Sequence, residues 1–167
     1  MRKLEEQQDD NAYTWICGTS GVGKETFIRT MMQGSNSQLR EIIGLSEPIT
    51  AYGRGFESYS VESLAQLTDH NAIIKWQFRT HKDIARLLHL KPNSSHSAVL
   101  LWRPYDLQIV DLQNRSQWAV NDTADTLKFD CGIIKRLFRR LQDETELSVH
   151  ILDASDRDYK IISDWPN

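Results

Sequence analysis

Residues 14–28 decide the fold of this chain, and they read TWICGTSGVGKETFI. The first four are mostly apolar and suit a buried strand, the next six include three glycines, and the last five begin an amphipathic helix. Gly18, Gly23 and Lys24 match the pattern G-x-x-x-x-G-K, in the strand-to-helix context in which that pattern binds phosphate. An ordinary strand–turn–helix corner is the alternative, but it does not require this spacing, the lysine and both flanks together.

Each residue type in this phosphate loop (residues 18–24) has a chemical task. Glycines let the backbone turn its N–H groups toward a bound anion, and the helix N-terminus adds partial positive charge. Lys24 is a compact cation that can reach the outer phosphates. The residues expected to bind a nucleotide are Gly18, Thr19, Ser20, Gly21, Val22, Gly23, Lys24, Glu25 and Thr26.

Over about residues 13 to 32 the sequence resembles the P-loop NTPases. The resemblance implies an α/β fold of three layers, with a central, mainly parallel sheet flanked by helices, and it implies ATP and Mg²⁺ as cofactors. Glu25 departs from the family, in which Ser or Thr usually follows the lysine and binds magnesium through its hydroxyl. Nucleoside monophosphate kinases, which are P-loop kinases of small molecules, often have Gly-Lys-Gly-Thr there. By that likeness Thr26 contacts the α-phosphate, and magnesium is held through waters and a carboxylate elsewhere.

Length and composition predict a flexible polar tail in residues 1–11 and a single domain in residues 12–167. The formal net charge of −3 gives no electrostatic footprint for duplex nucleic acid, so the expected partners are a nucleotide and a small-molecule acceptor. No apolar run approaches the roughly 20 residues of a membrane helix and no secretory h-region is present, which predicts a cytoplasmic protein with no membrane partner. Cys17 and Cys131 are expected to be buried free thiols in a reducing compartment.

Beyond the phosphate loop, apolar runs alternate with amphipathic stretches, which predicts an α/β sheet with right-handed crossovers. The expected strands are residues 72–78, 98–104 and 148–152, and the expected helices start near 24, 61 and 82. A long helix is expected after the capping residues 121–123, and Gly132, which costs about 1 kcal/mol relative to Ala, marks a point where it can break. Residues 39–60 have no regular pattern, and residues 159–167 are expected to form a turn or a final short strand.

The irregular segment places Arg54 between two glycines, with Tyr52, Phe56 and Tyr59 close by. In nucleotide kinases, the region after the loop helix folds over the phosphate acceptor. By that likeness Arg54 is a candidate for clamping a phosphate, and the aromatic rings are candidates for stacking a base. The alternative is a glycine turn with scattered surface aromatics.

Four further arginines are candidates for stabilising a transferring phosphoryl group. Arg103 follows a predicted strand at its C-terminal tip, where ligands collect in open α/β sheets, so Lys24 and Arg103 are the expected catalytic residues. A salt bridge to a neighbouring carboxylate is the alternative role for Arg103. Arg136, Arg139 and Arg140 lie opposite the apolar stripe of the long helix and invite comparison with the lid of nucleotide kinases. A solvated basic face is the alternative for these three residues.

The sequence leaves the magnesium carboxylate open. Asp111 and Asp153 both follow mostly apolar runs, although residues 104–106 just before the first run look like a helix start. The strand ending near Trp102 has no acid at its tip, where adenylate-kinase-like enzymes have Asp-Gly-x-Pro-Arg. Asp153, Ala154 and Ser155 resemble the Ile-Asp-Ala-Ser ending of thymidylate-kinase-like enzymes, which implies a loop near the nucleotide base.

Two functional hypotheses follow from these patterns. The first is a small P-loop kinase that transfers the γ-phosphoryl group of ATP to a nucleotide or nucleoside. The second is a nucleotide-binding regulatory or interaction module with weak or no hydrolysis, favoured by Glu25 and by the missing acid after Trp102. A GTPase is disfavoured, because neither an Asp-x-x-Gly after a strand nor an Asn-Lys-x-Asp motif is present.

Overall fold

The computed structural model describes residues 11–19, 21–34, 37–68, 70–76, 81–115, 124–156 and 158–164. Within them, six strands form one sheet in the order β2-β3-β1-β4-β5-β6, with β6 antiparallel to β5 and the other neighbours parallel. The strands are β1 (Ala12–Cys17), β2 (Ile49–Tyr52), β3 (Asn71–Lys75), β4 (Ser95–Trp102), β5 (Ser148–Asp153) and β6 (Lys160–Ile162). The helices are α1 (Lys24–Met32), α2 (Ser37–Ile43), α3 (Val61–Ala65), α4 (His81–Leu90), α5 (Tyr105–Arg115) and α6 (Ala124–Glu144).

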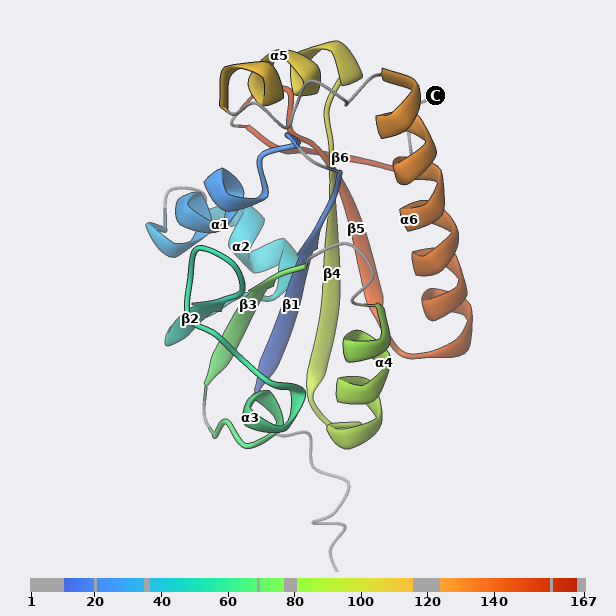
Figure 1. Cartoon of the computed structure of the whole chain (residues 1–167). Coiled ribbons are helices and arrows are strands. Elements are labelled where there is room, and N and C mark those ends of the chain that lie inside the picture. The colour runs from blue at the N-terminus through green and yellow to red at the C-terminus, as the bar shows by residue number, and fades with distance from the viewer. Residues whose placement is uncertain are drawn as a thin grey trace, which may run out of the picture.

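Helices cover both faces of the sheet, which gives the molecule three layers (Figure 1). Alternation along the central strand β1 divides the core, because successive side chains of a strand point to opposite faces. Trp15 and Cys17 pack with α3, α4 and α6, whereas Ile16 packs with α1 and α2. The predicted central, mainly parallel sheet flanked by helices is therefore confirmed.

The strand ends that lead into the phosphate loop form one edge of the sheet, called the carboxyl edge below. α5 lies across this edge and meets the beginning of α6 through Leu112 and Leu127 (Figure 1). From there α6 runs toward the opposite edge of the sheet (Figure 1). Only the first turns of α6 are therefore near the phosphate loop.

The structure corrects the prediction that residues 39–60 are irregular, because they contain α2 and β2. Both elements are short, and α2 buries just Leu39 and Ile43, so their local pattern is weak and tertiary packing stabilises them. Asp111 lies on α5 and not at the end of a strand, in agreement with the helix start seen at Pro104. α6 passes through Gly132 without a break.

Several expectations fall on parts of the chain that are not described, namely residues 1–10 of the tail and the capping residues 121–123. Asn11 is described and is buried, and its side chain donates to the Leu67 carbonyl at 2.5 Å. Cys17 and Cys131 are buried free thiols, as predicted, and burial raises the pKa of the Cys17 thiol well above its usual value. Among the described residues, no helix has the length and apolar character needed to cross a bilayer.

Candidate functional site

The phosphate loop leaves β1 at the centre of the carboxyl edge, so the strands on either side determine what surrounds it. On one side lie the loop that follows β2 and Lys75 at the end of β3. On the other side lie Arg103, directly after β4, and Asp153 at the end of β5. The structure therefore brings four of the sequence-predicted regions to one edge of the sheet, and it adds Lys75.

The phosphate loop is shaped to present positive charge. Gly23 is the N-cap residue of α1 with φ of 99°, a conformation that residues with a Cβ rarely adopt. Lys24 folds back over the loop, and its Nζ donates to the carbonyls of Gly18 at 2.9 Å and Thr19 at 3.2 Å. A lysine ammonium and a helix N-terminus thus meet at one place, which is the arrangement that binds phosphate. Ser20 lies outside the described residues.

Gln108 supports the phosphate loop from α5, and the sequence analysis did not identify it. The Thr19 hydroxyl donates to Gln108 Oε1 at 2.5 Å, and Gln108 Nε2 donates to the Arg103 carbonyl at 2.8 Å. Gln108 is fully buried, so both ends of its amide are satisfied by protein groups away from water. Its signal in the sequence is a single amide on an amphipathic helix, which by itself indicates nothing.

Arg103 contacts the same loop. Its Nη1 donates to the Gly21 carbonyl at 3.1 Å and pairs with the carboxylate of Asp111, one α5 turn beyond Gln108. The salt bridge considered as the alternative role of Arg103 is therefore present. The ion pair with Asp111 therefore keeps the Arg103 side chain at the loop backbone, and Arg103 is the partner of the Asp111 carboxylate.

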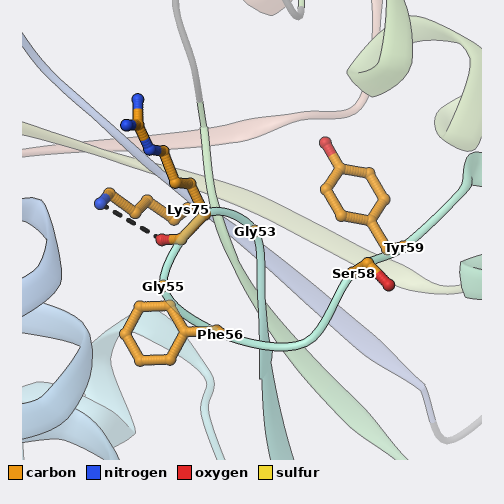
Figure 2. Close-up of a pocket in the computed structure, with 7 residues that line it drawn as sticks. Gly53, Gly55, Phe56, Ser58, Tyr59 and Lys75 are labelled. Atoms are coloured by element: carbon orange, nitrogen blue, oxygen red, sulfur yellow. Dashed lines mark hydrogen bonds between the residues drawn. The ribbon is translucent and has the colours of Figure 1, made fainter.

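A cavity of about 350 Å³ opens on the other side of the phosphate loop (Figure 2). It is lined by Gly53, Arg54, Gly55, Phe56, Ser58, Tyr59 and Lys75. Residues 53–59 are called the pocket loop below. The Lys75 Nζ donates to the Arg54 carbonyl at 3.3 Å, and Figure 2 shows the lysine side chain reaching this part of the loop. Two cationic and two aromatic side chains thus line one cavity, a combination that suits an anionic ligand with a planar ring.

Tyr59 forms part of the aromatic lining. Burial, followed by the charge of Asp83 and a hydrogen bond to it, raises the pKa of Tyr59 to about 12. Its hydroxyl lies 3.3 Å from Asp83 Oδ2, and its ring meets Trp15 edge-on at 6.1 Å between centroids. Tyr59 is therefore a neutral phenol at pH 7, fixed to β1 and α4.

The pocket loop and the helix of the phosphate loop are in direct contact. A Cβ placed on Gly55 would lie 2.6 Å from Glu25 Oε1, so a side chain larger than glycine would displace that carboxylate. Glu25 directly follows Lys24, and Thr26 beside it is exposed. The two candidate ligand sites therefore meet at Glu25.

The residues proposed as a base loop also lie at the carboxyl edge. Ala154 N donates to the Trp102 carbonyl at 2.6 Å, and Asp153 Oδ1 accepts from the backbone N and the hydroxyl of Ser155 at 2.9 and 2.6 Å. Further along, the ring of Tyr159 meets Phe27 of α1 at 4.8 Å. The segment after β5 therefore adjoins α1.

The three arginines of the long helix lie elsewhere. At 1.5 Å per residue, Arg136 is roughly 18 Å along α6 from Ala124, and Arg139 and Arg140 are farther from the carboxyl edge. Arg139 pairs with Asp164 at 3.4 Å, Arg140 lies 3.9 Å from Glu144, and all three arginines are exposed. The structure does not bring these residues to the phosphate loop, and their surroundings fit a solvated basic face.

Asp111 and Asp153, the two carboxylates considered for magnesium, and Glu25 have different surroundings. Asp111 forms an ion pair with Arg103, and Asp153 accepts hydrogen bonds from Ser155. Glu25 directly follows the phosphate loop in the sequence. Among the described residues, no group of three His, Cys, Asp or Glu side chains is placed to hold a metal by itself. A single carboxylate is nevertheless compatible with Mg²⁺, which takes its other ligands from waters and phosphates.

No protein-family model matches the sequence, and comparison with curated proteins finds no match. Among solved structures, a similar chain comes from the PezAT chromosomal toxin-antitoxin system of the human pathogen Streptococcus pneumoniae. The two chains are 16% identical with a TM-score of 0.60, over 93% of this chain and 72% of that one. At this identity the likeness shows the fold alone, and it agrees with the predicted α/β architecture of a mainly parallel sheet flanked by helices.

Proposed function

We propose that this chain is a P-loop kinase that binds ATP with Mg²⁺ and transfers the γ-phosphoryl group to a small acceptor such as a nucleotide or nucleoside. The observation that carries the proposal is a separate cationic and aromatic cavity beside α1, the helix that begins at the phosphate loop: the guanidinium carbon of Arg29 on α1 lies 4.9 Å from the ring centroid of Phe56, which lines that cavity. A kinase must hold two ligands side by side, whereas a hydrolase or a passive binder needs one.

The nucleotide side of the site uses residues 18–26. Lys24 and the backbone amides of the phosphate loop would hold the β- and γ-phosphates, and residues 153–155 would border the base. Magnesium, when bound, would offset the charge of the phosphates, and Glu25, which directly follows Lys24, is the carboxylate that would hold it directly or through water. Arg103 would keep the loop in shape through the Gly21 carbonyl.

The acceptor side of the site is the cavity of the pocket loop. Arg54 and Lys75 would attract an anionic acceptor, and Phe56 and Tyr59 would pack against its ring. An acceptor oxygen attacks the γ-phosphorus, a new P–O bond forms, and the bond to the leaving ADP breaks. Lys24 lies over the phosphate loop and Lys75 lines the cavity, and both would offset the developing negative charge.

The second candidate function is a nucleotide-binding regulatory or interaction module. The two strands next to β1 favour it, because β3 ends at Lys75 and β4 at Trp102, and neither strand has an acid at its end or directly after it. Glu25, which directly follows Lys24 in the sequence, already pairs with Arg29 at 3.1 Å. Such a protein would bind ATP and consume little of it.

A single assay separates the two functions. Purified protein with Mg²⁺-ATP is incubated with a panel of nucleosides, nucleotides and other small phosphate acceptors, and ADP release is measured. The kinase proposal expects ADP release that depends on one acceptor class and is absent in Lys24→Ala. Stabilisation of the protein by ATP, without acceptor-dependent ADP release, would favour the regulatory module. Absence of any ATP-induced stabilisation would contradict both.

A further inference from the structure

A chain of three side chains connects the phosphate loop to the wall of the cavity. Glu25 lies in the first turn of α1, and its Oε1 is 3.1 Å from Nη2 of Arg29, one turn later. The guanidinium carbon of Arg29 lies 4.9 Å from the ring centroid of Phe56, within cation–π range. Phe56 in turn lines the cavity (Figure 2). Arg29 is therefore shared between the helix that receives phosphate and the loop that forms the pocket.

Backbone hydrogen bonds connect Phe56 to the rest of the pocket loop, so a restraint on Phe56 also restrains its neighbours. Phe56 N donates to the Gly53 carbonyl at 2.9 Å, Gly53 N donates to Glu57 O at 2.8 Å, and Glu57 N donates to Ala51 O at 3.3 Å. Gly55, between Arg54 and Phe56, has φ of 92°, and a Cβ placed on it would lie 2.6 Å from Glu25 Oε1. The backbone of residues 53–57 thus behaves as one tight turn, which meets α1 at both Gly55 and Phe56.

We propose that Glu25 and Arg29 are positioning residues that link nucleotide occupancy of the phosphate loop to the shape of the pocket. The inference rests on the proposed function. Phosphates bound at the N-terminus of α1 order its first turn and place negative charge beside Glu25. That charge favours a cation nearby, so Arg29 is held more firmly at Glu25 and therefore over Phe56. Nucleotide binding then fixes the pocket loop, and by linkage an acceptor in the pocket strengthens nucleotide binding.

The size of this coupling is limited by exposure. The side chains of Arg29 and Glu25 are 57% and 45% exposed, so water and salt weaken the pair. A cation over an exposed ring contributes a similarly small amount. The two contacts together therefore support a coupling of about three- to tenfold.

Amide hydrogen exchange of residues 53–57 tests the inference without knowledge of the acceptor. In the parent protein, Mg²⁺-ATP is expected to slow exchange in this loop about three- to tenfold. Arg29→Ala should abolish that slowing while ATP still raises the melting temperature, because Lys24 and the phosphate loop are intact. Phe56→Leu, which keeps an apolar side chain and removes the ring, should give the same result.

Arg86→Ala is the matched control, since Arg86 forms a similarly exposed ion pair with Glu62, at 60% and 52% exposure. It should leave the ATP-dependent protection of residues 53–57 unchanged. Unaltered protection in Arg29→Ala, or a parent loop that does not respond to ATP although ATP stabilises the protein, would overturn the link. A parent protein that ATP does not stabilise at all would instead overturn the proposed function.

Discussion

The two flanks of the phosphate loop are held in different ways. On the β4 side, the fully buried Gln108 and the largely buried Arg103 bond directly to Thr19 and Gly21. On the β2 side, the pocket loop is held by Arg29, with 57% of its side chain exposed, and by Lys75. Buried hydrogen bonds fix a geometry, whereas exposed ones open easily. The half of the site proposed to bind nucleotide is therefore pre-formed, and the half proposed to bind the acceptor is held more loosely.

The largest expected effect is on the pre-formed half, in Lys24→Ala. The variant removes the cation that lies over the loop carbonyls and should abolish ATP-induced thermal stabilisation. Its circular dichroism should match that of the parent, because Lys24 is not part of the core clusters. Equal ATP stabilisation of variant and parent would contradict the assignment of the phosphate loop.

Gln108→Ala tests whether the buried support is structural. It leaves the Thr19 hydroxyl and the Arg103 carbonyl without their buried partner, which should lower the free energy of unfolding by about 2 kcal/mol. Val110→Ala, at a position 52% exposed on the same helix, should change it by less than about 0.5 kcal/mol. Urea denaturation measures both, and equal stabilities would show that Gln108 does not hold the loop.

Arg103→Ala distinguishes loop support from transition-state stabilisation. The Asp111 carboxylate is 38% exposed, so after allowance for solvent the loss of the pair should cost about 1 kcal/mol. Because Arg103 bonds to the Gly21 carbonyl, ATP affinity and turnover should fall together, each by about tenfold. Titration calorimetry and ADP release measure the two quantities. A loss of turnover with unchanged ATP affinity would indicate instead that Arg103 stabilises the transition state.

In the half proposed to bind the acceptor, Arg54→Ala should weaken acceptor binding and leave ATP binding unchanged. Arg54 is exposed at the cavity, so its loss should raise the acceptor KM about tenfold and leave ATP affinity and stability within experimental error. Arg140→Ala, an exposed arginine on α6, is the control and should change neither constant. An unchanged acceptor KM in Arg54→Ala would place the acceptor outside this cavity.

The smallest effect is expected from Glu25→Ser, at the boundary between the halves. A carboxylate beside polyphosphate is repulsive unless a metal or the helix N-terminus offsets it, and serine supplies the hydroxyl usual at this position. Magnesium-dependent ATP affinity should therefore stay within about twofold or improve. A collapse of that affinity, measured by calorimetry, would identify Glu25 as a required metal ligand or anchor.

The parts of the molecule also differ in how far the sequence alone predicted them. The phosphate loop was predicted in place because strand, glycines, lysine and helix are contiguous in residues 14–28, and local spacing sets their geometry. The alternation of strands and helices likewise indicated an α/β sheet, and the resemblance implied its three layers, which the structure confirms. Arg54, Tyr52, Phe56 and Tyr59 were the candidates from one short segment. The structure places Arg54, Phe56 and Tyr59 on one cavity, and Tyr52 is not among its lining residues.

The tertiary structure decided which distant residues reach the carboxyl edge. The order β2-β3-β1-β4-β5 places Lys75 beside the pocket loop and Arg103 beside Gly21, although residues 21 and 103 are far apart in the chain. Gln108 and Arg29 carry no sequence signal, because a buried amide or a surface arginine acquires a role only from the partner that packing brings to it. Local patterns determined the phosphate loop and the layers, whereas strand order determined its neighbours, since strand order depends on packing between segments far apart in sequence.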